Sequence, residues 1–181
     1  DQKDIIWFAG GHVRKITGNV KEYGKDKKDT KQTSFQTKTG FMTGCAALIS
    51  SEAINDIGYL DDQFFAYSED ADYSLRIIKS GHSIVFVPES IVYHKVSKSF
   101  KSILDLPHKY YLATRNIVYL QNKHLGKFTF LLFTFWFSLR WVFYLSIKLL
   151  LSGSYKTIKS LFKGFFDGLM KKKHSFIKYK A

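Results

Sequence analysis

The 181-residue sequence contains a single cysteine, Cys45, and only two prolines. One cysteine excludes an intrachain disulfide and a zinc site built on cysteines, and it fits a reducing compartment. Apolar residues make up 45% and charged residues 24% of the chain, so composition indicates neither a disordered protein nor a collagen-like repeat. The length allows one domain or at most two.

Acidic residues are almost missing from the second part of the chain. Residues 1–100 carry 13 Lys and Arg against 13 Asp and Glu, whereas residues 101–181 carry 15 against 2, together with 18 of the 31 aromatic residues. The sequence therefore divides into a neutral part and a basic, aromatic tail, a division that is not typical of a uniformly basic nucleic-acid-binding protein. Because the chain begins with Asp and no signal peptide is visible, we expect a piece of a longer protein.

Glycine positions and hydrophobic periodicity predict short strands alternating with short helices, an α/β arrangement. Apolar runs predict strands over 5–9, 41–49, 83–87 and 91–93. Ser51 and Ser68 are expected to cap two short helices that end before Gly58 and Gly81, and a longer helix is expected from Pro107 to about Lys123. In the second helix the expected buried stripe is Ala71, Leu75 and Ile78. The polar, lysine-rich residues 19–39 predict a surface loop.

The densest group of ionisable side chains is Glu69-Asp70-Ala71-Asp72, at the predicted start of a helix. One interpretation is that these acids only complement the helix dipole. The other is catalytic, because the apolar run Phe64–Tyr67 brings the carboxylates to the edge of a core, where partial burial raises their proton affinity. The spacing alone leaves both interpretations open.

Several short motifs follow one another in order: Thr43-Gly44-Cys45-Ala46, Gly58-Tyr59-Leu60-Asp61, the stretch from Phe64 to Arg76, Gly81-His82, Val87-Pro88-Glu89 and Tyr93-His94. This series resembles the C-terminal half of the catalytic domain of family 2 glycosyltransferases, particularly the rhamnosyltransferase-like group. Trp7 with Gly10-Gly11 resembles a segment slightly earlier in that family, and Tyr110-Tyr111 with Arg115-Asn116 resembles one just after the domain. The resemblance covers about residues 5–120.

The resemblance implies a partial GT-A fold and an inverting transferase that uses a nucleotide-diphosphate sugar and a divalent metal, Mn²⁺ or Mg²⁺. It implies that Asp70 is the general base that takes the proton of the acceptor hydroxyl, and that Glu69 orients the acceptor or Asp70. Asp72 is expected to act as a cap or an ion-pair partner. The resemblance also implies that His94 ligates the metal. Without the resemblance, a single histidine after a strand is more often a hydrogen-bonded core residue than a ligand.

The remaining candidate residues belong to the acceptor side, as the resemblance implies: Trp7, Gly10, Gly11, Thr43 and Gly44. Trp7 reads equally as a core aromatic, and Gly44 as a simple bend. In such enzymes the donor-binding half ends in an Asp-x-Asp motif. Asp70-Ala71-Asp72 has these letters, but it stands in the position of the base, so we expect the donor-binding half to be missing from this sequence. The sequence also contains no Gly-rich phosphate loop. We therefore expect transfer by the intact protein and not by this chain alone.

Residues 128–151 are almost wholly apolar and, as a helix of about 36 Å, could cross a hydrocarbon core of ~30 Å. Arg140 lies at the middle, where a charge costs roughly 2.5–3.5 kcal/mol, and lysines flank both ends. These features favour a helix that lies in or dips into one leaflet over one that spans. Apolar residues at helical spacing over 155–169, with lysines on the other face, are typical of an interfacial anchor. The alternative is a soluble helical subdomain.

Three parts are therefore expected: an acceptor-side half of a glycosyltransferase domain (1–104), a connecting helix (105–126) and membrane-associated helices (127–181). We expect an enzyme at the cytoplasmic face of the cell membrane that takes part in cell-envelope polysaccharide or glycolipid synthesis. Its expected partners are a nucleotide sugar, a glycan or lipid-linked acceptor and membrane lipid, with no nucleic acid. The alternative is a non-catalytic membrane-docking module in which Glu69 and Asp70 only cap a helix.

Overall fold

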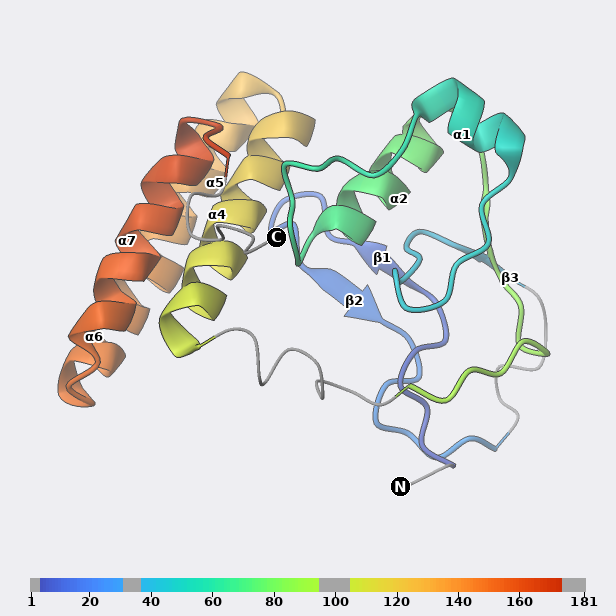
Figure 1. Cartoon of the computed structure of the whole chain (residues 1–181), viewed down its shortest axis with the longest axis horizontal. Coiled ribbons are helices and arrows are strands. Elements are labelled where there is room, and N and C mark those ends of the chain that lie inside the picture. The colour runs from blue at the N-terminus through green and yellow to red at the C-terminus, as the bar shows by residue number, and fades with distance from the viewer. Residues whose placement is uncertain (1–3, 31–36, 95–104, 174–181) are drawn as a thin grey trace, which may run out of the picture. The chain divides into compact units, whose positions relative to one another are not determined.

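The structure is a computed structural model that describes residues 4–30, 37–94 and 105–173 (Figure 1). The chain forms two compact units. The mixed unit is drawn from residues 1–14, 19–61 and 69–96, and the helical unit from residues 15–18, 62–68 and 97–181. The expected boundary near residue 104 and the middle of the expected loop, 31–36, lie outside the described residues. The division into three parts stays a prediction.

The strands of the mixed unit form two antiparallel pairs. β1 (Gly11–Val13) pairs with β2 (Val20–Glu22), and β3 (Thr37–Thr39) pairs with β4 (Ile84–Phe86). Helix and sheet are mixed as expected, but the described strands make two two-stranded sheets and not one α/β layer. The GT-A arrangement stays a prediction.

Three of the four expected strands are wrong. Residues 5–9 make only one bridge, between Ile5 and Lys28, and residues 41–49 and 91–93 are irregular. The run from Ile5 is held by a turn instead of a ladder, since the N–H of Ile6 donates to the carbonyl of Lys27. Conversely, the expected loop over 19–39 contains β2 and β3. Gly18, which has a φ of 70°, turns the chain between β1 and β2. The sequence Thr17-Gly18-Asn19 was therefore the local signal that could have predicted this hairpin.

Two short helices lie where the glycines predict them. α1 (Ser51–Ile57) ends at Gly58, but its N-cap is Ser50, one residue before the expected Ser51. α2 (Glu69–Lys79) also agrees with the prediction, except for its buried face. Of the expected stripe, Ala71 is buried as predicted, Leu75 is partly buried and Ile78 is 46% exposed, whereas Tyr73 and Ile77 are buried. The buried face is set by tertiary contacts, in which Tyr73 and Ile77 pack with Ile84 of β4.

The helical unit consists of α4 (Leu106–His124), α5 (Lys127–Phe137), the π-helical turn η1 (Ser138–Phe143), α6 (Tyr144–Leu151) and α7 (Tyr155–Leu169). Figure 1 shows α4 and α7 side by side along their length. Their shared core with α5, η1 and α6 contains the buried residues Val118, Phe133, Phe137, Val142, Leu149, Leu161 and Phe165. The expected helices over 107–123 and 155–169 are confirmed, and Asp105 caps α4 by accepting from the N–H of His108.

Residues Lys127–Leu151 form one helical run that is long and apolar enough to span a membrane, by length and composition. Only 17% of its most apolar window is buried. Large apolar side chains of the run remain exposed, among them Phe128, Leu131, Phe135, Leu139, Phe143, Ile147 and Leu151. The π-helical turn contains Arg140, whose guanidinium lies 5.6 Å from the ring centroid of Trp136. An interruption of this kind is typical of a helix under a local functional or packing constraint.

Candidate active site

The two candidate catalytic acids open α2 after an unusual backbone turn. Tyr67 and Ser68 have φ angles of 72° and 70°, in the left-handed region that residues other than glycine rarely adopt. Ser68 is the expected N-cap of α2, but an ordinary N-cap residue has an extended backbone with a negative φ, unlike Ser68. Glu69 and Asp70 follow directly, so the chain reaches the acids through two strained residues.

The segment before this turn is fixed by a buried amide. The Asn116 side chain of α4 donates to the carbonyl oxygens of Ala66 at 2.7 Å and Tyr67 at 2.9 Å, and Asn116 has no exposed surface. Its neighbour Arg115, also fully buried, donates to the carbonyl of Gln63. Both residues belong to the helical unit, as does the segment they hold. They form a clamp on residues 63–67, whose chain continues into α2.

The Asp70 carboxyl makes one bond inside its helix and one outside it. Oδ1 accepts from the N–H of Ala71 at 2.8 Å, and Oδ2 accepts from the N–H of Gly44 at 3.4 Å. Burial raises the pKa of Asp70 above its usual range; the backbone N–H groups of Gly44, Ala71 and Asp70 itself oppose this rise, and the Glu22 carboxylate adds to it. The carboxylate is therefore a stronger proton acceptor than an exposed aspartate.

Glu69 is partly buried beside Asp70. Burial raises the pKa of Glu69, its own backbone N–H opposes the rise, and the charge of Asp70 adds to it. Its Oε2 is buried without a hydrogen-bond partner among the described residues. Burying a carboxylate oxygen without a hydrogen bond costs free energy of folding. A hydroxyl group of a substrate could supply the missing hydrogen bond to Glu69.

Gly44 links Asp70 to three other side chains of the mixed unit. The next residue, Cys45, has its Sγ 3.8 Å from Nε2 of His94, and the His94 ring meets the Trp7 ring edge-on with centroids 4.5 Å apart. Pairwise contacts thus connect four of the residues singled out from the sequence, in a series that passes through Cys45: Asp70, Gly44, His94 and Trp7. Cys45 was missed as a site residue, because a lone exposed cysteine carries no positional signal.

The other expected acceptor residues have packing roles. A Cβ on Gly11 would lie 2.6 Å from the carbonyl oxygen of Lys21 on β2, and one on Gly10 would lie 2.9 Å from Oγ1 of Thr39. Thr43 is buried, and its hydroxyl accepts from the N–H of Cys45. Their part in acceptor binding stays a prediction. Asp72 is confirmed as an ion-pair partner, since it is fully buried and bonded to Arg76 at 2.9 Å.

The described residues do not by themselves form a metal site. Within residues 4–30, 37–94 and 105–173, no three His, Cys, Asp or Glu side chains gather closely enough to hold an ion. The sulfur of Cys45, 3.8 Å from Nε2 of His94, is a soft donor that suits Mn²⁺ or Mg²⁺ poorly. The divalent metal and the role of His94 in binding it stay predictions, and no chemical step below depends on them.

Comparison with known proteins assigns the class. Residues 13–163, most of the chain, match the family model described as glycosyl transferase family group 2. The chain therefore belongs to this family of glycosyltransferases.

Two curated relatives are similar over 91 residues at 29% identity: the N-acetylglucosaminyl-diphospho-decaprenol L-rhamnosyltransferases of two strains of Mycobacterium tuberculosis. The alignment covers 48% of this chain and 28% of each relative, so the chain spans little more than a quarter of the length of the curated relatives it matches. No solved structure matches the chain significantly.

Proposed function

We propose that the protein containing this chain transfers a sugar, of the hexosyl or rhamnosyl type, from a nucleotide-diphosphate donor to a hydroxyl group of a glycan or lipid-linked acceptor. Asp70 takes the acceptor proton as the hydroxyl oxygen bonds to the anomeric carbon. The bond from that carbon to the nucleotide diphosphate breaks on the opposite face, so the configuration inverts. Glu69, whose Oε2 has no partner among the described residues, accepts a second hydrogen bond from the acceptor or orients Asp70.

One observation supports this proposal most directly: the contact between Asp70 and Gly44. The backbone of Gly44 has no positive φ, and among the described residues a Cβ there would touch only Asp70, 4.0 Å from its Cβ. Neither conformation nor packing therefore requires glycine at this position. What the missing side chain provides is open space beside a carboxylate of raised proton affinity, as an approaching hydroxyl needs.

The acceptor and the location follow from the helical unit and the family. One relative is named for a diphospho-decaprenol acceptor, and this chain has a helical run long enough to span a membrane with apolar side chains exposed along it. We place the helical unit at the cytoplasmic face of the cell membrane, where it holds the reaction close to a lipid-linked acceptor of cell-envelope synthesis. Flotation of the protein with anionic vesicles tests this part by itself.

The test of the chemistry is Asp70→Asn in the intact protein, with transfer to a polyprenyl-diphosphate sugar acceptor as the readout. Asparagine keeps the shape and, through Oδ1, one of the two backbone hydrogen bonds, but it takes no proton, so kcat should fall by about 10²–10⁴. Asp56→Asn is the control, because Asp56 is an exposed aspartate of the same unit that pairs with His82. Transfer at the normal rate by a folded Asp70→Asn protein would show that Asp70 is not the base.

The second candidate function is a non-catalytic docking module, favoured by the bond from the Ala71 N–H to Asp70 within the first turn of α2. Stability distinguishes the two. If Asp70 only caps α2, removing its charge lowers stability at neutral pH. Since burial raises the pKa of Asp70, the ionised form is disfavoured in the fold, and we expect Asp70→Asn to raise the Tm at neutral pH.

A further inference from the structure

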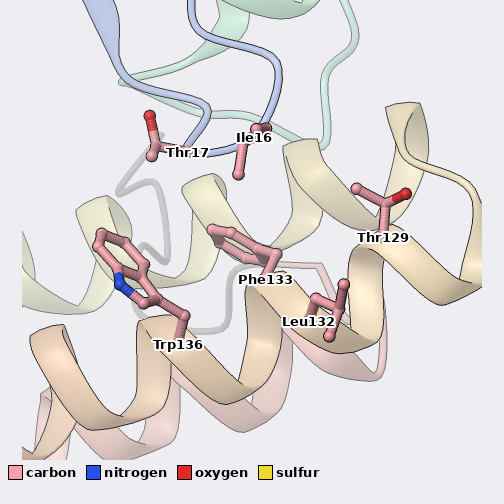
Figure 2. A pocket seen from close by; sticks show the side chains of 6 residues that line it. All are labelled: Ile16, Thr17, Thr129, Leu132, Phe133 and Trp136. Atoms are coloured by element: carbon pink, nitrogen blue, oxygen red, sulfur yellow. The ribbon is translucent and has the colours of Figure 1, made fainter.

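The helical unit contains an apolar pocket of about 380 Å³ on α5. It is lined by Ile16, Thr17, Thr129, Leu132, Phe133 and Trp136. Figure 2 shows the α5 side chains, including the rings of Phe133 and Trp136, facing the loop that carries Ile16 and Thr17. The volume is within the range of pockets that bind small molecules.

The loop side of the pocket is held by buried contacts, so its shape is built into the unit. Gln121 of α4, which is 1% exposed, donates through its side-chain amide to the carbonyl oxygens of Lys15 at 2.8 Å and Ile16 at 2.9 Å. Gly18, at a φ of 70°, lies so close to α4 that a Cβ would be 2.7 Å from Cδ1 of Ile117. A loop held in this way keeps the Ile16 side chain, 71% of it exposed, beside α5 instead of burying it in a core.

The chemistry around the pocket suits an amphiphile. Leu132 and Trp136 are 54% and 46% exposed, so the pocket is continuous with the apolar outer face of the Lys127–Leu151 run. Two exposed cations adjoin its lining in the sequence: Lys15 precedes Ile16, and Lys127 stands two residues before Thr129. An apolar cavity that opens on an exposed apolar helix fits a hydrocarbon chain, and basic residues close to its lining in the sequence suit an anionic phosphate headgroup.

We propose that this pocket binds the polyisoprenoid chain of the lipid-linked acceptor, at the segment nearest its phosphate groups. The inference rests on the proposed function, because that function supplies a lipid-linked acceptor to a chain with a membrane-facing helix. An isoprenoid chain carries a methyl branch on every unit, and the pocket offers aromatic rings and a branched side chain to contact those methyl groups. Binding here would select acceptors by their lipid, separately from the chemistry at Asp70.

The test is photochemical capture by the intact protein in lipid nanodiscs. The probe is farnesyl diphosphate with a benzophenone at its tail, and the comparison probe is phosphatidylglycerol with a benzophenone in one acyl chain. Cross-linked peptides are located by mass spectrometry, with unlabelled polyprenyl phosphate as competitor. We expect the isoprenoid probe to label residues 16–17 and 129–136, the competitor to remove that labelling, and the phospholipid probe to label the apolar face without preference for the pocket.

A matched pair of variants tests the pocket itself. Leu132→Trp fills it, whereas Leu131→Trp places the same bulk on the adjacent residue, which is 65% exposed and does not line it. We expect capture of the isoprenoid probe to fall about tenfold in Leu132→Trp, equivalent to about 1.4 kcal/mol, and to stay unchanged in Leu131→Trp. Equal effects of the two variants, or labelling of the pocket by the phospholipid probe as strong as that by the isoprenoid, would overturn the proposal.

The outcome is separable from the proposed transfer reaction, because capture needs no turnover. Asp70→Asn should capture the probe as the parent protein does. If Asp70→Asn retains transfer while the pocket is labelled, the proposed base is wrong and the lipid site stands. If Asp70→Asn abolishes transfer while Leu132→Trp leaves capture unchanged, the pocket proposal alone is wrong.

Discussion

The packing of α4 against α7 predicts a large effect from two of the smallest substitutions available. Gly164 and Gly168 are four residues apart and lie on one face of α7. A Cβ on Gly164 would be 2.5 Å from the carbonyl oxygen of Tyr111, and one on Gly168 would be 2.7 Å from the carbonyl oxygen of Arg115 and 2.8 Å from Cβ of Val118. Backbone atoms of a helix cannot move aside as a side-chain end can, so alanine at either position must push the helices apart.

The expected size of the effect follows from two opposing contributions. Ordinary contact between a Cβ and a neighbouring heavy atom begins at 3.4 Å, so the helices must separate by roughly 1 Å. Overpacking of this kind typically costs about 1–3 kcal/mol. Alanine regains about 1 kcal/mol of intrinsic helix propensity relative to glycine. Separation also weakens the bond between the Tyr111 hydroxyl and the buried Asp167 carboxylate, now 2.9 Å long, which is worth about 1.5–3 kcal/mol. We expect a net loss of about 1–3 kcal/mol for each variant.

Thermal unfolding in detergent micelles, followed by circular dichroism at 222 nm, measures this loss. For a unit of this size the Tm should fall by roughly 5–20 °C in Gly164→Ala and in Gly168→Ala. Gly126→Ala is the control, because none of the described residues lies within 4 Å of a Cβ at this N-cap of α5, and the weaker capping by alanine should cost less than about 1 kcal/mol. If the two α7 variants were as stable as the parent or more so, helix propensity would dominate, and the close approach of α4 and α7 would be refuted.

Three further predictions concern the candidate active site. Burial raises the pKa of Asp70, and the base acts when it is ionised. On the acidic side, kcat/KM should therefore increase with pH, with an apparent pKa above the ordinary aspartate value of about 3.9. An apparent pKa at or below that value contradicts the assignment. Gly44→Val should abolish transfer and leave the Tm unchanged, whereas Gly11→Val should lower the Tm because its Cβ would meet the Lys21 carbonyl. Transfer assays and thermal unfolding measure the two effects. The reverse pattern would exclude Gly44 from the acceptor side. Asn116→Ala removes the donor of the buried bond to the Ala66 carbonyl and of the partly buried bond to the Tyr67 carbonyl, which should cost about 1–3 kcal/mol. Amide exchange over residues 63–70, followed by mass spectrometry, should become faster; unchanged exchange there contradicts the clamp.

The sequence was most informative where one face of a helix is apolar. The bounds of α7 (Tyr155–Leu169) and the start of α2 at Glu69 could be predicted, because periodicity and glycine positions are local signals. The buried face of α2 could not, since Tyr73 is buried through distant contacts, including a bond from its hydroxyl to the carbonyl of Gly58. The expected strand over 5–9 failed because a buried apolar run can be satisfied by turns as well as by a ladder.

For the candidate site, sequence reasoning found the residues but not the contacts that group them. The acids were visible as a cluster, whereas the Gly44 contact depends on two segments 26 residues apart. Arg115, Asn116 and Gln121 are three buried polar residues of α4 whose partners are carbonyl groups of segments far away in the chain. The sequence does not show which backbone group a polar side chain of a helix will bind. These hydrogen bonds between side chains and distant carbonyl groups therefore cannot be predicted from sequence patterns.

Two aspartates at helix starts show how the same residue type serves different ends in this protein. The N–H of His108 lowers the pKa of the exposed Asp105, so its stabilising contribution is present above the unfolded pKa and is lost as the pH falls through the folded pKa. Burial raises the pKa of Asp70, so its contribution has the opposite sign: it is present below the unfolded pKa and is lost as the pH rises through the folded pKa. At neutral pH Asp105 therefore stabilises its helix, whereas the ionised Asp70 is disfavoured by its surroundings. A carboxylate that serves only as a cap has the first signature; Asp70 has the second, and the high proton affinity that makes it unfavourable for folding is the property that a general base requires.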